Sequence, residues 1–171
     1  MYNQRYYYLA EGECEEKLLK ALKENPALIH PGKVDKFNVL KKELKPNKLM
    51  TFQPGSCVVF VFDTDVQETA ILKKNLELVK SMCFQVEVLT VMQVLTFEDE
   101  IERSTDVVHA KDLTRSSAIS DFKSAVNRMK AIEFRNALKR HKFDLSKLWI
   151  GNPPKAFVFI QQDTERIKTS E

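Results

Sequence analysis

The stretch CVVFVFDTD, residues 57–65 of this chain of 171 residues, decides the fold. Its first six residues, Cys57–Phe62, are all apolar, which predicts a strand that is buried on both faces. Such strands belong to parallel sheets with helices packed on each side. Asp63 and Asp65 follow at the point where the strand gives way to a loop. The stretch therefore predicts an α/β fold and places two carboxylates at the end of a central strand.

The segments around this strand alternate between strand and helix patterns. We expect further strands at Tyr6–Ala10, Lys36–Val39 and Val86–Val91. The spacing of apolar residues predicts helices within residues 11–25, Glu68–Met82 and Phe97–Ser104. Leu40–Phe52 contains Pro46, so a short helix and a loop are expected there. This order predicts a three-layer α/β arrangement with a mostly parallel central sheet and right-handed crossovers.

The pattern changes after Thr105. Ile119–Lys142 forms one long amphipathic stretch that is basic on its polar face. We expect a core over residues 1–105 and a C-terminal, basic helical extension over residues 106–160 that packs on it. Within the extension, the candidates for one more strand are Leu148–Ile150 and Ala156–Ile160. Residues 161–171 form a polar tail, the only segment whose composition permits disorder.

Composition excludes several classes of protein. Hydrophobic residues make up 43% of the chain and charged residues 30%, as in a protein with a substantial core. The N-terminus shows no signal-peptide pattern, and no apolar run approaches the roughly 20 residues of a membrane helix, so we expect a cytoplasmic protein without membrane contact. The cysteines are too widely spaced for a zinc site, and we expect free thiols at Cys14, Cys57 and Cys83.

Charge is distributed unevenly along the chain. Residues 1–102 carry 13 Lys and Arg against 16 Asp and Glu, a net charge of −3, whereas residues 103–147 carry 11 against 5, a net charge of +6. An acidic metal pocket beside a surface that attracts phosphate would have this distribution. A solvated helical face with surplus lysine would have it too.

Acidic residues follow three of the predicted strands. Glu11 comes directly after the first strand, Asp63 and Asp65 come after the third, and Glu98 and Glu100 come shortly after the fourth. The carboxyl ends of parallel strands meet at one edge of the sheet, so these side chains are expected to converge there. Because clustered carboxylates repel one another, they require a cation, and their hard oxygens suit Mg²⁺ or Mn²⁺.

Glu15 lies one helical turn after Glu11, and it could add a metal ligand or orient the others. Each acidic position also has a structural explanation. A DxD pair often caps a helix or forms a turn. Glutamates near position 15 favour a helix N-terminus through the helix dipole, and residues 98–100 could simply start a helix.

The motifs YLAEGECE and VFVFDTD resemble, in order and strand context, the two motifs of the Toprim domain. This domain is shared by topoisomerases, bacterial primases, RecR-type proteins, the ribonuclease that matures 5S rRNA and OLD-family nucleases. The resemblance covers roughly residues 1–105. It is closest to the OLD type, whose EGxxE motif is met by Glu11, Gly12 and Glu15 and whose next acidic motif is met by Glu98 or Glu100.

The chain has no room for the tyrosine-bearing domain of topoisomerases, and it lacks a zinc module and a GxxxxGK[ST] loop. The resemblance therefore implies a small stand-alone nuclease that hydrolyses DNA or RNA, with a separate ATPase or other subunit as a further expected partner. It implies that Mg²⁺ or Mn²⁺ is held by Glu11, Asp63 and Asp65, while Glu15, Glu98 or Glu100 completes a second metal site or acts as general base. The basic candidates for contacting nucleic acid are Lys111, Arg115, Lys123 and Arg128.

Two alternatives fit the same residues. A degenerate Toprim core would make a nucleic-acid-binding or assembly module that binds its partner through residues 103–147 without turnover. A receiver-like domain would instead accept a phosphoryl group on Asp63. Lys155 is the candidate for the lysine that such domains carry near a late strand.

Overall fold

The computed structural model describes residues 4–24 and 26–169, and strands and helices alternate through its first part. In chain order these elements are β1 (Tyr6–Ala10), α1 (Glu13–Leu22), β2 (Gly32–Lys36), α2 (Pro46–Leu49), β3 (Cys57–Asp63), α3 (Ala70–Met82), β4 (Glu87–Gln93) and α4 (Phe97–Ser104). The extension adds α5 (Ile119–Arg128) and α6 (Ala131–Arg140), with 3₁₀ turns at Ala110–Thr114, Leu145–Lys147, Lys155–Phe157 and Thr164–Arg166. No helix in the described part of the chain is both long enough and apolar enough to cross a membrane.

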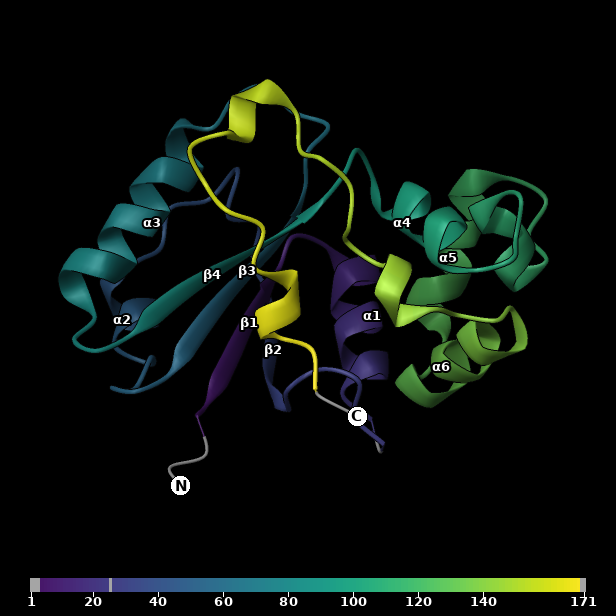
Figure 1. Cartoon of the computed structure of the whole chain (residues 1–171), viewed down its shortest axis with the longest axis horizontal. Helices are drawn as coiled ribbons and strands as arrows, with labels where there is room; N and C mark the ends of the chain where they lie inside the picture. The colour runs from purple at the N-terminus through teal and green to yellow at the C-terminus, as the bar shows by residue number, and fades with distance from the viewer. Residues whose placement is uncertain (1–3, 25, 170–171) are drawn as a thin grey trace.

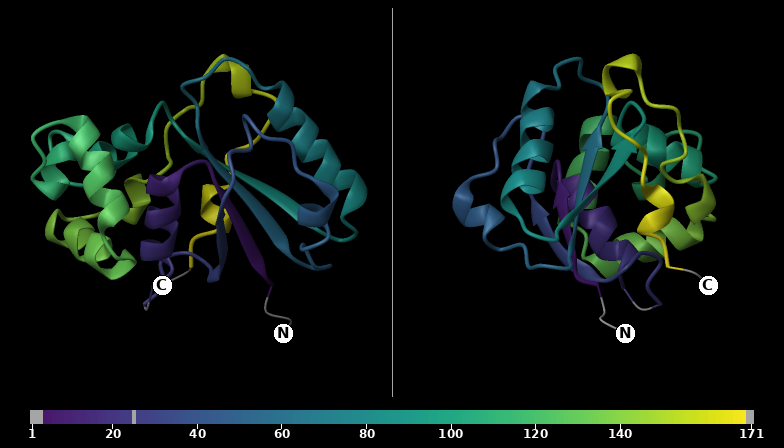
Figure 2. Two further views of the ribbon diagram at one scale, coloured as in Figure 1. Left: turned by 180° about the vertical axis from the view of Figure 1, so that it is seen from behind. Right: turned by 60° about the vertical axis from the view of Figure 1, so that its left-hand side comes forward.

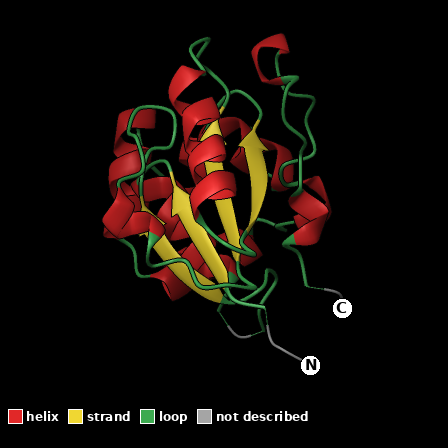
Figure 3. Cartoon of the chain, turned by 90° about the vertical axis from the view of Figure 1, so that its left-hand side faces the viewer, coloured by secondary structure: helices red, strands yellow, loops and turns green. Residues whose placement is uncertain are grey.

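The four strands form one parallel sheet in the order β2-β1-β3-β4, and their arrows point the same way in Figure 3. Helix α3 lies on one side of the sheet, whereas α1 and the helices of the extension lie on the other (Figures 1 and 2). The first six residues of β3 are buried, as the apolar run predicts. The predicted α/β fold with helices on both faces of a parallel sheet is confirmed.

Alternate residues of β3 supply the two halves of the core. Val59 and Val61 belong to a cluster with the leucines of α1 and the aromatic residues of α4, α5 and α6. Phe60 and Phe62 belong to a second cluster with the apolar face of α3. Complete burial of one such side chain contributes roughly 1.5–3 kcal/mol, so the helices are held mainly by these two layers.

The strand order creates a switch point between β1 and β3. After β1 the chain crosses through α1 to β2 on one side, and after β3 it crosses through α3 to β4 on the other side. The two connecting helices leave on opposite faces of the sheet, so the carboxyl ends of β1 and β3 border a crevice. Glu11 and Asp63 stand at those two ends.

The second strand begins earlier than predicted. The expectation of a strand at Lys36–Val39 was wrong, because β2 covers Gly32–Lys36 and pairs with β1. Gly32 lies so close to β1 that an added Cβ would come within 2.4 Å of the Tyr6 carbonyl oxygen. Asn38 ends the extended segment, since its Oδ1 accepts hydrogen bonds from the amides of Leu40 and Lys41, both at 3.0 Å.

The long amphipathic stretch Ile119–Lys142 is two helices and not one. Met129 and Lys130 have extended backbone conformations, with ψ angles of 147° and 156°, between α5 and α6. A carboxylate oxygen of Glu133 accepts a hydrogen bond from the Lys130 amide at 2.7 Å, which gives α6 its own N-terminal cap. The break lets both helices turn apolar faces toward α1, so the extension packs on the core.

The candidate final strand at Leu148–Ile150 and Ala156–Ile160 was wrong, since neither segment is a strand. Pro153 and Pro154 lack amide hydrogens, and the chain after them turns through a 3₁₀ helix that buries Phe157.

The edge of β4 is covered by side chains of the C-terminal segment. The Gln162 carboxamide donates to the carbonyl of Met92 at 2.8 Å and accepts from the amide of Met92 at 2.7 Å. The Asp163 carboxylate accepts from the amide of Thr90 at 2.9 Å. These bonds satisfy an edge that would otherwise be open to pairing with another strand. The described part of the predicted polar tail, residues 161–169, is thus packed against the sheet, with Ile167 buried.

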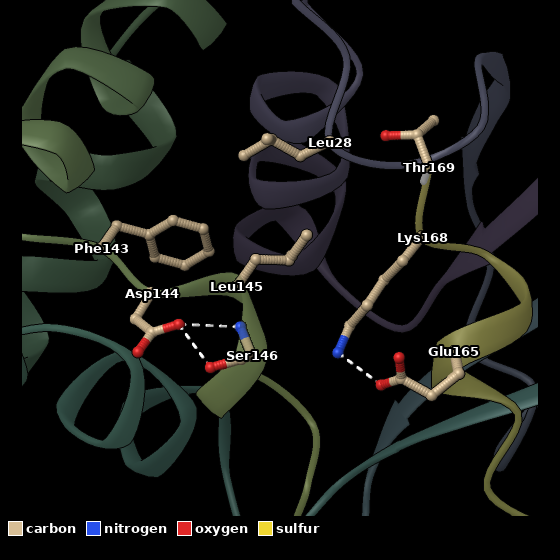
Figure 4. Close-up of a pocket in the computed structure, with 8 residues that line it drawn as sticks. All are labelled: Leu28, Phe143, Asp144, Leu145, Ser146, Glu165, Lys168 and Thr169. Atoms are coloured by element: carbon tan, nitrogen blue, oxygen red, sulfur yellow. Dashed lines mark hydrogen bonds and ion pairs between the residues drawn. The ribbon is translucent and has the colours of Figure 1, made fainter. Parts of the chain in front are cut away.

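A hollow of about 560 Å³ lies where this segment meets the chain after α6. Figure 4 shows Phe143 and Leu145 on one side of it and the ion pair of Lys168 with Glu165, 2.6 Å long, on the other. It lies away from the carboxyl edge of the sheet and contains none of the predicted site residues. The three cysteines are free and buried in the structure, as predicted.

Candidate functional site

Three strand ends are joined by the side chain of Glu11. Its Oε2 accepts a hydrogen bond from the Asp63 amide at 2.9 Å, and its Oε1 accepts one from the Asn38 side-chain amide at 2.9 Å. The Glu11 amide in turn donates to the Val61 carbonyl at 3.0 Å. Glu11 is therefore fixed at the switch point between β1 and β3, with the residue that follows β2 holding its other oxygen.

A hollow of about 380 Å³, called here the carboxylate hollow, opens at this point. Residues of α1, of β3 and of the segments that follow β1 and β2 form one part of its wall, and residues of α4 and α5 form the other. The lining residues are Glu11, Gly12, Glu13, Cys14, Glu15, Asn38, Asp63, Phe97, Lys123 and Asn127. The structure thus brings together Glu11, Glu15, Asp63 and Lys123 of the residues predicted from the sequence.

Asp63 is the carboxylate most perturbed by this environment. Its Oδ1 is buried and has no hydrogen-bond partner among the described residues. Burial raises the pKa of Asp63 to about 8, and the negative charges of Glu15, Glu11, Asp65 and Glu98 add to the rise. A carboxyl group in this position gains strongly from a cation that replaces its lost hydration.

Glu15 is buried on the first turn of α1, with 6% of its surface exposed. Burial raises its pKa to about 7, and the charge of Glu11 acts in the same direction. Gly12 makes room for this carboxylate, because a Cβ at position 12 would lie 2.8 Å from Glu15 Oε2. The glycine of the EGxxE motif therefore has a steric role here: it lets Glu15 fold back toward Glu11.

Lys123 reaches the carboxylate hollow from α5. Its Nζ forms an ion pair with Glu98 of α4 at 2.9 Å. The bond to Glu98 raises the pKa of Lys123, as do the nearby Cys14 and Asp63 groups. The second oxygen of Glu98, Oε2, is buried without a partner in the described structure. Lys123 thus adds a positive group to the hollow, and Glu98 lies beside the hollow as its partner.

Glu100 does not belong to this site, although the sequence offered it as a ligand. It is completely buried, and its two oxygens accept hydrogen bonds from the amides of Val94 at 2.9 Å and Trp149 at 2.8 Å. It also pairs with Arg103 at 2.7 Å. These contacts join α4 to the loops after β4 and before the C-terminal segment, so the role of Glu100 is structural.

Asp65 and three of the basic candidates also lie outside the lining of the carboxylate hollow. Asp65 is exposed, although its charge contributes to the raised pKa of Asp63. Lys111 donates to the Ser117 carbonyl at 3.3 Å, and Arg128 donates through Nε to a carbonyl of its own helix at 3.1 Å. Arg115 lines a different hollow, described below.

Three polar residues near the site were missed from the sequence. Asn38 holds Glu11, and Asn127 of α5 accepts a hydrogen bond from the Cys14 thiol at 3.4 Å. Gln93 is fully buried beside Asp63 in the strand register, and neither end of its carboxamide has a partner in the described chain. The only sequence signal for Gln93 is a polar residue that closes an otherwise apolar stretch, VLTVMQ.

Hard oxygen ligands are present, but they are not arranged as a closed cage. Among residues 4–24 and 26–169, no group of three or more His, Cys, Asp or Glu side chains meets the geometry of a metal site. The orphaned oxygens of Asp63 and Glu98, together with Glu11 and Glu15, nevertheless fit Mg²⁺ or Mn²⁺ in chemistry. Binding a cation here requires side-chain movement, because Glu11 and Glu98 already have protein partners.

Comparison with known proteins finds no matching family model, no similar curated protein and no similar solved structure. The resemblance to the Toprim domain stays a prediction from its two motifs. The function of the site is therefore inferred from its own geometry and charge.

The raised pKa values predict that the cation-free protein loses stability as the pH rises from about 4 to about 8. Over this range the folded chain keeps protons on Asp63 and Glu15 that the unfolded chain releases, so deprotonation favours unfolding. We expect a loss of about 2–4 kcal/mol in the free energy of unfolding, measured by urea titration in EDTA at several pH values. Asp63→Asn should flatten this profile, and an unchanged profile in that variant would contradict the assignment.

Proposed function

We propose that this protein is a divalent-cation-dependent nuclease that hydrolyses phosphodiester bonds in DNA or RNA. One observation carries the proposal: Asp63 presents a buried, unpartnered carboxylate oxygen beside Glu11, Glu15 and Glu98 at the switch point of a parallel sheet. Ligands of such sheets bind at this point, and clustered buried carboxylates need a cation. The opposing Lys123 supplies the positive charge that a phosphate group requires.

Each residue of the carboxylate hollow has a role in this proposal. Asp63 and Glu11 would hold Mg²⁺ or Mn²⁺, and Glu98 lies beside the hollow as the partner of Lys123. A cation bound there would lower the pKa of a water molecule and neutralise charge on the phosphate. Asn38 and the Asp63 amide keep the Glu11 carboxylate in place. Glu15, whose pKa lies near neutrality, is suited to exchange a proton with water.

Lys123 would stabilise the negative charge that builds up on the phosphate during hydrolysis. We expect Lys123→Met to lower the single-turnover cleavage rate about 100-fold at saturating Mg²⁺, while the fold is kept because the side chain is half exposed. Lys139→Met, which removes an exposed lysine of α6 outside the hollow, is the matched control. Equal rates in the two variants would remove Lys123 from the mechanism.

The second candidate function is a nucleic-acid-binding or assembly module without turnover. It is favoured by the lack of a closed metal cage among the described residues and by the ion pair that already engages Lys123. The receiver-like alternative has no such support, because Lys155 lies in a 3₁₀ turn and does not line the carboxylate hollow. A separate ATPase or other subunit as partner stays a prediction.

The two candidates are separated by a cleavage assay. Purified protein is incubated with end-labelled single- and double-stranded DNA and RNA in Mg²⁺, in Mn²⁺ or in EDTA, and products are resolved on denaturing gels. We expect at least one substrate to be cut in the presence of a cation and none in EDTA. Salt-dependent binding without cleavage in either cation would contradict the nuclease proposal and favour the binding module.

A further inference from the structure

The basic residues of the extension are not equivalent in the structure. Of the 11 Lys and Arg in residues 103–147, seven are engaged by other groups of the protein. Four form ion pairs, at 2.7 Å for Arg103 with Glu100, 2.9 Å for Lys123 with Glu98, 3.5 Å for Lys142 with Asp106 and 3.6 Å for Lys147 with Asp144. Arg135 is buried and donates to backbone carbonyls in the last turn of α1 and after it. Lys111 and Arg128 donate to backbone carbonyls, as described above. The positive charge that is available to a partner therefore comes from fewer residues than the composition indicates.

Two of the remaining basic residues converge. Arg115 and Arg140 are far apart in the sequence, yet both line one hollow of about 290 Å³, called here the arginine hollow. The other lining residues are Leu113, Thr114, Met129 and His141. Neither arginine forms an ion pair in the described structure, and both are exposed. Asp106, which pairs with the lining residue His141 at 3.2 Å, is also bound by Lys142.

The backbone holds Arg115 in an uncommon conformation. Its φ angle of 57° lies in the left-handed region, which arginine rarely adopts. Hydrogen bonds from its amide to the Asp112 carbonyl at 3.2 Å and from the Ser116 amide to the Lys111 carbonyl at 2.9 Å fix this turn. The turn therefore fixes the backbone from which the Arg115 side chain projects, and residues in this region of φ are enriched at functional sites.

The arginine hollow and the carboxylate hollow both border the C-terminal end of α5. Asn127 lines the carboxylate hollow, and Met129, the residue that caps the helix, lines the arginine hollow. Lys17 of α1 donates to the Met129 carbonyl there, which places another positive charge beside the arginine hollow.

We infer that the arginine hollow binds a backbone phosphate of the nucleic acid, a few nucleotides from the bond presented to the carboxylate hollow. A guanidinium group can bind two oxygens of one phosphate through parallel hydrogen bonds. Two arginines without carboxylate partners can therefore bind one phosphodiester group together. This inference rests on the proposed function, because it assigns a second place at which the protein contacts the nucleic-acid substrate. A substrate must then be long enough to reach both hollows.

The test uses the full chain and separates binding from cleavage. Affinity for a fluorescent single-stranded oligonucleotide is measured in EDTA over a range of salt concentrations for the wild type and for Arg115→Ala/Arg140→Ala. Each lost phosphate contact lowers the salt slope by about 0.7, so the double variant should lose a slope of about 0.7–1.4 and bind about tenfold more weakly at low salt. Lys130→Ala/Lys139→Ala removes the same charge from α6 outside the hollow and is the matched control.

Cleavage of two substrates distinguishes this inference from the proposed function. A dinucleotide reaches only the carboxylate hollow, so the arginine double variant should cut it at the wild-type rate, whereas KM for a long oligonucleotide should rise about tenfold. Equal effects of the arginine variant and the lysine control would overturn the inference while leaving the nuclease proposal intact. Binding of inorganic phosphate that depends on the two arginines, without any binding of the oligonucleotide, would also overturn it and assign the hollow to a free-phosphate ligand.

Discussion

Asp63→Asn is expected to lower cation-dependent cleavage at least about 1,000-fold at neutral pH. The substitution keeps the size of the side chain but removes the carboxyl group that a bound cation would deprotonate and bind. Since the proposed reaction depends on a bound cation, the loss of a ligand whose Oδ1 is buried without a protein partner removes both water activation and charge neutralisation. The measurement is a single-turnover time course in Mg²⁺ and in Mn²⁺, with the substrate that the wild type cuts best.

Asp65→Asn is the matched control for Asp63→Asn. Asp65 belongs to the same DTD motif but is exposed and does not line the hollow. We therefore expect a much smaller loss of activity than for Asp63→Asn. Calorimetric titration with Mn²⁺ should show that Asp63→Asn loses cation binding while its thermal transition stays cooperative. Full activity of Asp63→Asn would end the nuclease proposal, and equal losses in both variants would return Asp65 to the metal site.

The sequence predicted the sheet and the centre of the site because both depend on local patterns. An apolar run such as Cys57–Phe62 can be satisfied only by burial on two faces, and a parallel sheet provides that burial. Once the strands are parallel, residues that follow them must lie at one edge. Glu11 and Asp63 could therefore be placed together without knowledge of the side-chain packing. Glu15 followed from helical spacing alone.

The parts that could not be predicted depend on contacts between distant segments. Lys123 and Asn127 enter the hollow only because α5 packs against α1, and an amphipathic pattern does not specify which of its polar residues border a hollow. The break after α5 was missed because a single hydrogen bond from Lys130 to Glu133 decides it. Gln162 pairs with the backbone of β4 through its side chain, as a neighbouring strand would through its backbone, and no strand pattern in the sequence indicates such a contact.

The acidic motif after β4 shows why helix geometry was needed to select one carboxylate. Glu98 and Glu100 are two residues apart, which places them about 200° apart around α4, on opposite sides of the helix. Glu98 therefore pairs with Lys123 at the hollow, while Glu100 points into the protein and holds two backbone amides. A motif that requires only an acidic residue after β4 is met by Glu98 and by Glu100. The geometry of the helix allows only one of the two to face the site.

Glu100→Ala is accordingly expected to destabilise the protein by about 3–5 kcal/mol, because it leaves the Val94 and Trp149 amides and the Arg103 side chain without their buried partner. For a chain of this length the thermal midpoint should fall by roughly 10 °C. Glu98→Ala, the matched control, should change stability by no more than about 1 kcal/mol, since its partner Lys123 is half exposed, but it should weaken Mn²⁺ binding. Thermal unfolding in EDTA and calorimetric titration measure the two effects. A stable Glu100→Ala variant that fails to bind Mn²⁺ would make Glu100 a ligand and reverse the roles assigned to the two sides of α4.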